Sequence, residues 1–263
     1  MNIRLQIIGG GNMGEALVSG LMANHWASEK EIHISEPFSE RQKYLKTAFS
    51  GISCSEELIS GVDTLIAVKP DKVLEVLKLL LDLRIPRVLS IAAGVKISTI
   101  EKVLGSDVKV IRAMPNTPAL IGQGAAGVAP GSQAKEEDLS WAIRILSAVG
   151  LALVVSESQL DAVTGISGSG PAYLFLLAEA LIEAGCEIGL SRDDSKALVE
   201  QTLLGSASLL MDSADSPEVL RKKVTSKGGT TAAAITVFEK ANFRSIVLDA
   251  VTSAKERSKE LGD

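Results

Sequence analysis

Short apolar runs recur through the first part of the chain, and each is followed by a turn and a segment of helical periodicity. In residues 73–81, for example, apolar side chains return every three or four positions. Strands that alternate with helices in this way predict a parallel, doubly wound sheet. The predicted strands are residues 3–8, 31–35, 62–68, 88–92 and 108–113.

Two further strands, at 124–129 and 151–155, are predicted to close this domain, joined by a helix that contains Trp141. The strand pattern stops after Ser156, and residues 158–261 show helical periodicity throughout. We therefore expect an α/β domain over residues 1–157, followed by an all-helical domain over residues 158–263.

The first helical segment of the second domain is apolar on all sides. Residues 172–178 contain no charged side chain, and a helix of this kind must be buried all round. About a hundred residues of helix cannot easily bury it alone, so we expect a subunit interface, with a two-fold dimer as the simplest form. A central helix in a monomeric bundle is the alternative.

A glycine motif follows the first predicted strand. Gly9, Gly11 and Gly14 form G-x-G-x-x-G, and a helical run over residues 15–23 comes next. In this context the first glycine permits the tight turn, the second lets a pyrophosphate approach, and the third lets helix and strand pack closely. We predict a Rossmann-type domain that binds a dinucleotide; the alternative is a glycine turn without a ligand.

An acidic residue ends the second predicted strand. Glu36 stands where an acid normally binds the ribose hydroxyls of NAD, which argues against NADP. Ser35, Ser39 and Arg41 crowd the same turn, and Glu36 could instead face solvent. The residues alone leave the choice between the two cofactors open.

Two glycines also mark a helix start in the second domain. Gly228 and Gly229 follow Ser226 and precede Thr230 and Thr231, just before an apolar helical pattern. A helix start offers unpaired N–H groups and about half a positive charge, so it can hold a carboxylate. The alternative is an ordinary helix capped by Thr230 or Thr231.

The amino-acid composition limits the classes of molecule that the protein is expected to bind. Aromatic residues make up only 3% and the net charge is −5, without a basic block, so nucleic acid and anionic membranes are poor candidates. Cys54 and Cys186 lie far apart and form no metal cluster with the two histidines, which favours a reducing cytoplasm. No signal peptide or membrane span is expected, because glycines and a proline interrupt residues 162–178.

The absence of common proton-donating residues limits which reductions the protein can catalyse. Reduction of a ketone or aldehyde commonly uses His or Lys as proton donor, yet the helical domain has no histidine, and no asparagine in the chain has a lysine four residues on. A protonated imine is already electrophilic, so its reduction needs an anion site more than an acid. We favour C=N reduction with a nicotinamide cofactor. The alternatives are a 3-hydroxy- or 2-hydroxyacid dehydrogenase and a nucleotide-sensing protein without hydride transfer.

Five blocks, in order and covering nearly the whole chain, together resemble the pyrroline-5-carboxylate reductase family. The resemblance implies the last step of L-proline synthesis, in which NAD(P)H reduces 1-pyrroline-5-carboxylate. NADPH is the usual reductant of the family and NADH is the other option. An intertwined helical dimer, often assembled into a decamer, with sites between subunits, is also implied. The blocks are residues 9–14, 67–70, 114–118, 161–173 and 224–231.

The same resemblance assigns the site residues, with no metal among them. Thr231 lies nearest the ring nitrogen of the substrate as the catalytic proton partner. Lys227 stands where proline is common in the family, and Ser55 where many relatives have asparagine. The residues implied to bind substrate are Ser226, Gly228, Gly229, Thr230 and Thr231. Those implied to bind the adenine-side phosphates are Gly9, Gly11, Asn12, Met13, Gly14 and Ser35. Those implied to line the nicotinamide side are Ala67, Val68, Lys69, Pro70, Ala92, Ala93 and Asn116.

Overall fold

The computed structural model describes residues 3–262. Contacts divide the chain into two compact units: Met1–Ser169 with Thr252–Asp263, and Gly170–Val251. Residues 252–262 thus pack with the first unit, which the apolar pattern does not reveal. The functional division predicted at 157/158 stays a prediction.

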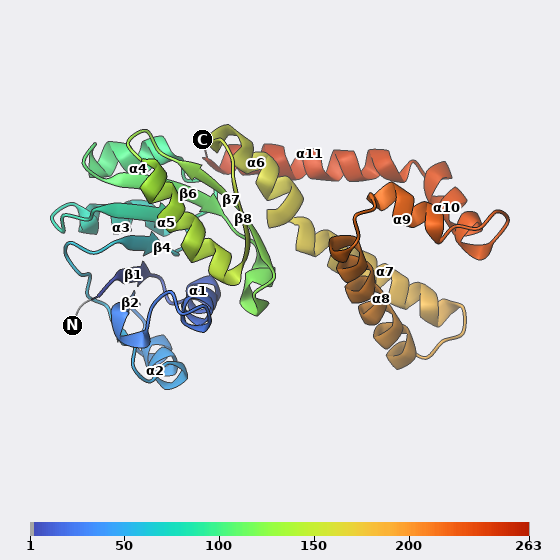
Figure 1. The fold of residues 1–263 in the computed structure, drawn as a ribbon, viewed down its shortest axis with the longest axis horizontal. Helices are drawn as coiled ribbons and strands as arrows, with labels where there is room; N and C mark the ends of the chain where they lie inside the picture. Colours follow the sequence, from blue (N-terminus) through green and yellow to red (C-terminus); the bar gives the residue numbers. More distant parts are fainter. Residues whose placement is uncertain (1–2, 263) are drawn as a thin grey trace. The chain divides into compact units, whose positions relative to one another are not determined.

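The first unit is built on a sheet of eight strands (Figure 1). Its order is β3-β2-β1-β4-β5-β6-β7-β8, and every neighbouring pair is parallel except β6 and β7. This confirms the predicted mostly parallel sheet. The strands are β1 (Leu5–Ile8), β2 (Ile32–Ser35), β3 (Ser53–Ser55), β4 (Thr64–Ile66), β5 (Arg87–Ser90), β6 (Lys109–Met114), β7 (Gly124–Pro130) and β8 (Gly150–Val154).

Helices cover both faces of this sheet because successive strand residues point to opposite sides. Leu65 belongs to one buried cluster, with side chains of α1, α2 and α5. Its neighbour Ile66 belongs to the other, with side chains of α3, α4 and α6. Two cores on one sheet confirm the doubly wound prediction. These helices are α1 (Asn12–Ala23), α2 (Ser39–Ala48), α3 (Val73–Leu80), α4 (Ile97–Leu104), α5 (Glu136–Leu146) and α6 (Leu160–Val163).

One strand of the sheet was not predicted. Strand β3 has only three residues, two of them serines, and pairs with β2 from the edge of the sheet. Its middle residue, Cys54, is buried, and burial raises the pKa of its thiol. Both Cys54 and Cys186 are free thiols. A strand this short and polar carries no apolar pattern that a sequence could show.

The interruption expected from the glycines and the proline within residues 162–178 is present between α6 and α7. A π-helical turn, Thr164–Gly168, joins α6 to α7 (Gly170–Glu187), and the Ser169 amide donates to the Thr164 carbonyl at 2.8 Å. Pro171 lies in the first turn of α7, where its missing N–H is tolerated. Among the described residues, the stretch Glu157–Glu187 is long and apolar enough, by length and composition, to cross a membrane.

The second unit is entirely helical, as predicted. Within α7, Leu174, Phe175 and Leu176 are 57%, 63% and 67% exposed, so the unit itself does not bury this apolar segment. A helix apolar on all sides requires a cover. The remaining helices are α8 (Arg192–Asp212), α9 (Pro217–Lys223), α10 (Thr230–Lys240) and α11 (Phe243–Gly262), the last of which ends in the first unit.

Candidate active site

The glycine loop has the conformation that its sequence predicts. Gly9 has a positive φ of 104°, and a Cβ atom there would lie 2.7 Å from the Ala67 carbonyl oxygen. A Cβ on Gly14 would collide with the Gly9 carbonyl. A Cβ on Gly11 would meet nothing within 4 Å, so this side of the loop is open. The first and third glycines are therefore needed for packing, while the second borders free space.

That free space lies at the start of α1. Gly11 is the N-cap residue of α1, and no side chain caps the helix. Its first N–H groups are consequently free to bind an anion such as a pyrophosphate. The loop thus fits a dinucleotide by two separate observations, the open side at Gly11 and the uncapped helix. Asn12 and Met13 form the first turn of α1.

The strand register brings the predicted cofactor loops to one edge of the sheet. Ile8 in β1 pairs with Ile66 in β4, Ile66 pairs with Ser90 in β5, and Ser90 pairs with Arg112 in β6. The loops that follow these strands therefore start from one row at the carboxyl edge, where ligands bind in this architecture. They carry Ala67, Val68, Lys69 and Pro70 after β4, Ala92 and Ala93 after β5, and Asn116 after β6.

The nicotinamide-side residues differ in their surroundings. The Ala67 amide donates to the Ile8 carbonyl at 2.8 Å, which ties this loop to the glycine loop. Lys69 is exposed, and Ala92 is buried. The Asn116 carboxamide donates to the Ser167 carbonyl at 3.0 Å and accepts from the Ala125 amide at 2.8 Å. Asn116 therefore fastens the π-helical turn to the sheet.

Two residues of the adenine side have partners within the protein. The Ser35 hydroxyl donates to the Glu56 carbonyl at 3.2 Å. Glu36 is only 6% exposed, so the alternative in which it faces solvent is wrong. Its carboxylate accepts from the amides of Gly10 and Phe38, both at 3.0 Å. This buried, hydrogen-bonded position could not be read from the crowded turn in the sequence.

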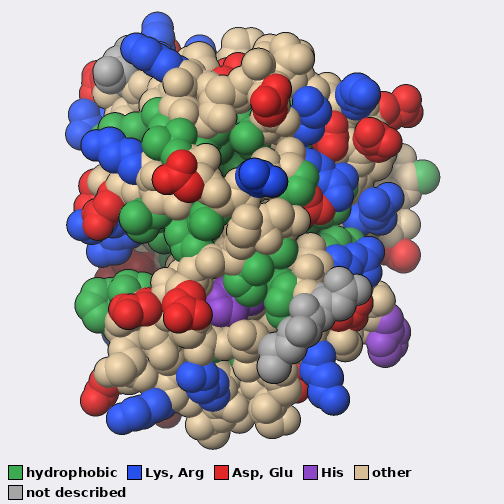
Figure 2. Space-filling model, turned by 90° about the vertical axis from the view of Figure 1, so that its left-hand side faces the viewer, with side chains coloured by type: hydrophobic (Ala, Val, Ile, Leu, Met, Phe, Trp, Pro, Cys, Tyr) green, Lys and Arg blue, Asp and Glu red, His purple; other side chains and the backbone are tan. Residues whose placement is uncertain are grey.

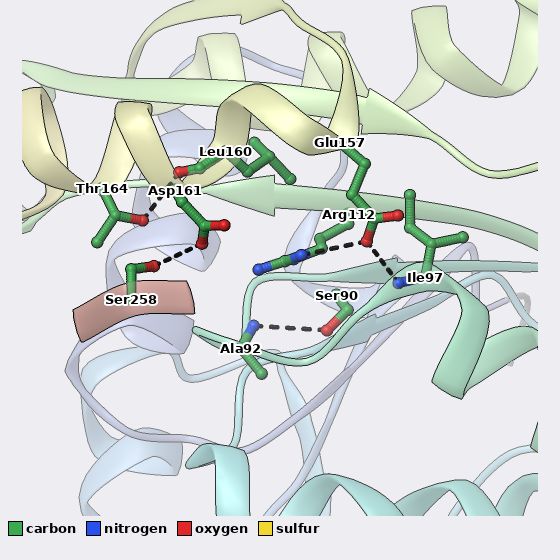
Figure 3. A network of polar contacts seen from close by, with 9 residues as sticks. All are labelled: Ser90, Ala92, Ile97, Arg112, Glu157, Leu160, Asp161, Thr164 and Ser258. Carbon is green, nitrogen blue, oxygen red and sulfur yellow. Dashed lines mark hydrogen bonds and ion pairs between the residues drawn. The ribbon is translucent and has the colours of Figure 1, made fainter. Parts of the chain in front are cut away.

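A group of polar contacts, which the sequence did not indicate, links β6 to the start of α4 and α6 to α11 (Figure 3). Arg112 in β6 pairs with Glu157 at 3.1 Å, and the same Glu157 oxygen accepts from the Ile97 amide at 2.7 Å. Ser258 of α11 donates to Asp161 of α6 at 2.8 Å. These partners are 45 to 97 residues apart in the chain, so no local spacing signals them.

The end of α11 also touches the loop after β5. A Cβ atom on Gly94, whose φ is 75°, would lie 2.9 Å from the Leu261 carbonyl. The backbones therefore approach too closely for any side chain at this position. The returning helix thus supports the loop that carries Ala92 and Ala93.

The predicted substrate residues lie together at the start of α10 in the second unit. Gly229 is the N-cap residue, and no side chain caps the helix, so the alternative of a Thr230 or Thr231 cap is wrong. Both threonines belong to the first turn. Gly228 has a φ of 74°, and a Cβ on Gly229 would collide with the Ser226 hydroxyl. The turn therefore requires glycine at 228, whereas a side chain at 229 would displace the Ser226 hydroxyl, and the first amides of α10 are left unpaired.

This arrangement, an uncapped helix behind a glycine loop at the switch between β1 and β4, together with a helical second unit, defines a dinucleotide-binding domain of the kind found in nicotinamide-dependent oxidoreductases. Residues 4–94 match the family described as NADP oxidoreductase, coenzyme F420-dependent, and residues 157–261 match pyrroline-5-carboxylate reductase dimerisation.

Full-length relatives agree with these matches. The chain is 42% identical to a pyrroline-5-carboxylate reductase of Synechocystis over 100% of this chain and 99% of that protein. A solved pyrroline-5-carboxylate reductase of Coxiella burnetii is 35% identical, covers 100% of both chains and gives a TM-score of 0.92. A Plasmodium falciparum pyrroline carboxylate reductase solved with NADP bound is 32% identical, with a TM-score of 0.84 and coverage of 100% and 99%. The chain belongs to the pyrroline-5-carboxylate reductase family.

Proposed function

We infer that the chain reduces the C=N bond of 1-pyrroline-5-carboxylate with NAD(P)H to give L-proline, the last step of proline synthesis. The observation that carries this conclusion is the 42% identity to a pyrroline-5-carboxylate reductase along the entire chain. When bound, NAD(P)H supplies the hydride. The glycine loop and the uncapped start of α1 hold its phosphates.

Substrate binding is assigned to the start of α10. The substrate carries a negative charge on its carboxylate, and the unpaired amides of Thr230 and Thr231 lie at the positive end of the helix. Gly228 and Gly229 keep the approach to these amides free of side chains, and Ser226 adds a hydroxyl beside them. Binding of the carboxylate here requires no arginine.

Proton transfer is simple in this reaction. The protonated imine carries its proton on the ring nitrogen, the hydride adds to the adjacent carbon, and the nitrogen keeps that proton in the product amine. The Thr231 hydroxyl is assigned to this nitrogen as hydrogen-bonding partner. The helical domain therefore needs no histidine, and it contains none.

The roles of the remaining cofactor residues follow their positions. Ala67 to Pro70, with Ala92 and Ala93, line the nicotinamide side along the carboxyl edge of the sheet. Asn116 acts on the same side by fixing the π-helical turn, since its carboxamide is already bonded at both ends. Ser35 acts through the backbone, because its carbonyl accepts from the Gly9 amide at 2.9 Å.

The exposed helices of the second unit support the assembly that we propose. Residues 158–263 form the dimerisation and substrate domain, with a dimer as the functional unit and a decamer as its higher assembly. The stretch Glu157–Glu187 lies almost entirely within the matched dimerisation region, so its apolar surface serves a second copy and not a membrane. Figure 2 shows acidic and basic side chains interspersed on one face, which suits a protein of the cytoplasm that does not bind nucleic acid.

One assay tests the proposal. Purified protein is mixed with 1-pyrroline-5-carboxylate and either nicotinamide, and the loss of reduced cofactor is followed by absorbance together with the proline formed. We expect equal amounts of cofactor oxidised and proline produced. Turnover of 2- or 3-keto acids in place of the imine would identify a hydroxyacid dehydrogenase. Cofactor binding without turnover of any of these would identify a nucleotide-sensing protein.

A further inference from the structure

The turn after β2 holds a carboxylate in one fixed place. Glu36 is 6% exposed, and each of its two oxygens accepts a backbone N–H, one from Gly10 and one from Phe38. Gly10 lies inside the glycine loop itself, so the carboxylate is bonded to the segment that receives the dinucleotide. Each carboxylate oxygen can accept a second hydrogen bond. Glu36 therefore remains able to accept a hydroxyl, but it cannot turn away.

The arginine of the same turn is occupied. Arg41 donates through Nε to the Gly10 carbonyl at 2.6 Å, and its guanidinium pairs with Glu15 of α1. The guanidinium carbon lies 4.6 Å from the centre of the Tyr44 ring, and the Tyr44 hydroxyl donates to Glu15 at 3.0 Å. The charge of Arg41 is thus balanced and its orientation fixed by partners within the protein.

These two observations bear on the one chemical difference between NADH and NADPH. In dinucleotide-binding folds an acid after the second strand accepts the ribose 2′-hydroxyl of NAD, whereas a nearby arginine accommodates the 2′-phosphate of NADP. A phosphate brought to this turn would meet the Glu36 charge. The Gly10 and Phe38 amides and the Nε of Arg41 already donate within the protein, and the charge of Arg41 faces Glu15.

We propose that this chain is selective for NADH, with Glu36 as the residue that rejects the 2′-phosphate and Glu15 as the residue that keeps Arg41 from binding it. The proposal rests on the NAD(P)H chemistry inferred above and adds the choice between the two cofactors. Ser39 and Lys43 remain exposed on α2. If NADPH were the better reductant, these two side chains would have to bind its 2′-phosphate.

A binding experiment tests the proposal without turnover. Calorimetry on the full-length protein compares AMP with adenosine 2′,5′-bisphosphate, which differ only in the 2′-phosphate. We expect AMP to bind about tenfold more tightly or better, because like charges close together in a partly buried site repel strongly. Tighter binding of the bisphosphate would overturn the proposal. An AMP preference in a protein that reduces no imine would leave the selectivity standing and reject the function.

Three glutamate variants identify the residues responsible. Glu36→Gln removes the charge, and we expect the ratio of kcat/KM for NADH to that for NADPH to fall about tenfold. Glu15→Gln leaves Glu36 and its two amides intact but removes the charge that balances Arg41, so we expect a fall of about fivefold, the value of one partly exposed ion pair. This second variant keeps the test valid if Glu36→Gln perturbs the glycine loop.

Glu40→Gln is the matched control. Glu40 is exposed in the first turn of α2, and its substitution changes the net charge by the same amount. We expect the ratio to stay at the wild-type value. An equal shift in all three variants would mean that general charge, and not the turn after β2, sets the preference.

Discussion

The two compact units of this chain bury their apolar residues in different ways. The buried hydrophobic side chains among the described residues belong to the first unit, where Leu5, Leu65 and Leu89 are completely covered. In the second unit only Gly185 and Ser195 are buried, while five leucines of α7 and α8 are more than half exposed: Leu174, Leu176, Leu198, Leu204 and Leu209. The first unit contains its own hydrophobic core. The second unit has apolar side chains of the kind that form a core, but within the single chain they are exposed.

This difference shows where each unit obtains its stability. A sheet with helices on both faces is closed by its own chain. Apolar helices without such a cover gain stability only from a second copy, so folding and association of this unit are linked. The family match of residues 157–261 to a dimerisation region names the same segment.

The largest effect is expected from a charge placed on the uncovered surface. Leu176→Asp in α7 changes a side chain that is 67% exposed in the single chain. A carboxylate buried without a partner in the dimer is strongly destabilising, so we expect the dissociation constant to rise about a hundredfold or more. Analytical ultracentrifugation over a range of concentrations measures this constant, and activity should be lost with the dimer.

The matched control lies in the first unit. Leu79→Asp in α3 alters a leucine that is 60% exposed, nearly the same fraction. We expect the dimer and its activity to persist, since this leucine lies on the solvent side of a completed core. Dissociation of both variants, or of neither, would contradict the contrast between the units.

The next effect concerns the core of the first unit. Leu65→Ala in β4 empties space at a side chain with no exposure, and we expect the free energy of unfolding to fall by about 2–5 kcal/mol. Leu74→Ala in α3, at a side chain 51% exposed, should change it by less than about 0.5 kcal/mol. Urea denaturation at one fixed protein concentration provides both values; similar losses would mean that β4 is not the centre of a closed core.

A smaller effect is expected at the substrate site of the second unit. Thr231→Ala removes one hydroxyl from the first turn of α10, and we expect kcat/KM for the imine to fall by the equivalent of about 1 kcal/mol, with less change in NAD(P)H binding. Thr236→Ala, further along α10, removes a hydroxyl that bonds only to the Ala232 carbonyl. Its kinetics should remain those of the wild type. Unchanged kinetics for Thr231→Ala would mean that the substrate loop is misassigned.

The smallest effect is a local titration in the first unit. The Ser28 amide and hydroxyl both donate to Glu31, and these bonds hold the pKa of Glu31 below its ordinary value. The stabilisation is therefore present above the unfolded pKa and is lost as pH falls through the folded pKa. In NMR titrations, Ser28→Ala should raise the pKa of Glu31, while Leu176→Asp should leave it unchanged because the first unit does not depend on the dimer. A shift in Leu176→Asp would show that it does.

Much of the fold could be predicted because its signals are local. Seven strands and their alternation with helices followed from runs of apolar residues, and the helical character of residues 158–261 followed from the periodicity of their side chains. Strand β3 was missed because it has three residues and two serines. The glycines and the proline correctly indicated an interruption before α7, and Pro171 falls in a first turn that tolerates it, but no sequence pattern indicated that the turn before it is π-helical.

The candidate site likewise contains residues that the sequence predicts and contacts that it does not. Gly9, Gly11 and Gly14 were predictable since their order along the chain is itself the geometric requirement. The exposure of Glu36 and the partners of Arg41 were not, because both depend on the Gly10 backbone, 26 and 31 residues away. The contact of Gly94 with Leu261 joins positions that nothing in the sequence relates.

By itself, the sequence determined the alternation of strands and helices, the two glycine-rich helix starts and the apolar helix that needs a partner, because each is a pattern within one short segment. Only the tertiary structure decided that the chain's end returns to the first unit, that Glu36 is fixed by two amides, and that Arg112, Glu157 and Ile97 form one network. Such contacts join residues distant in the chain, and they form only when the strands pair in register.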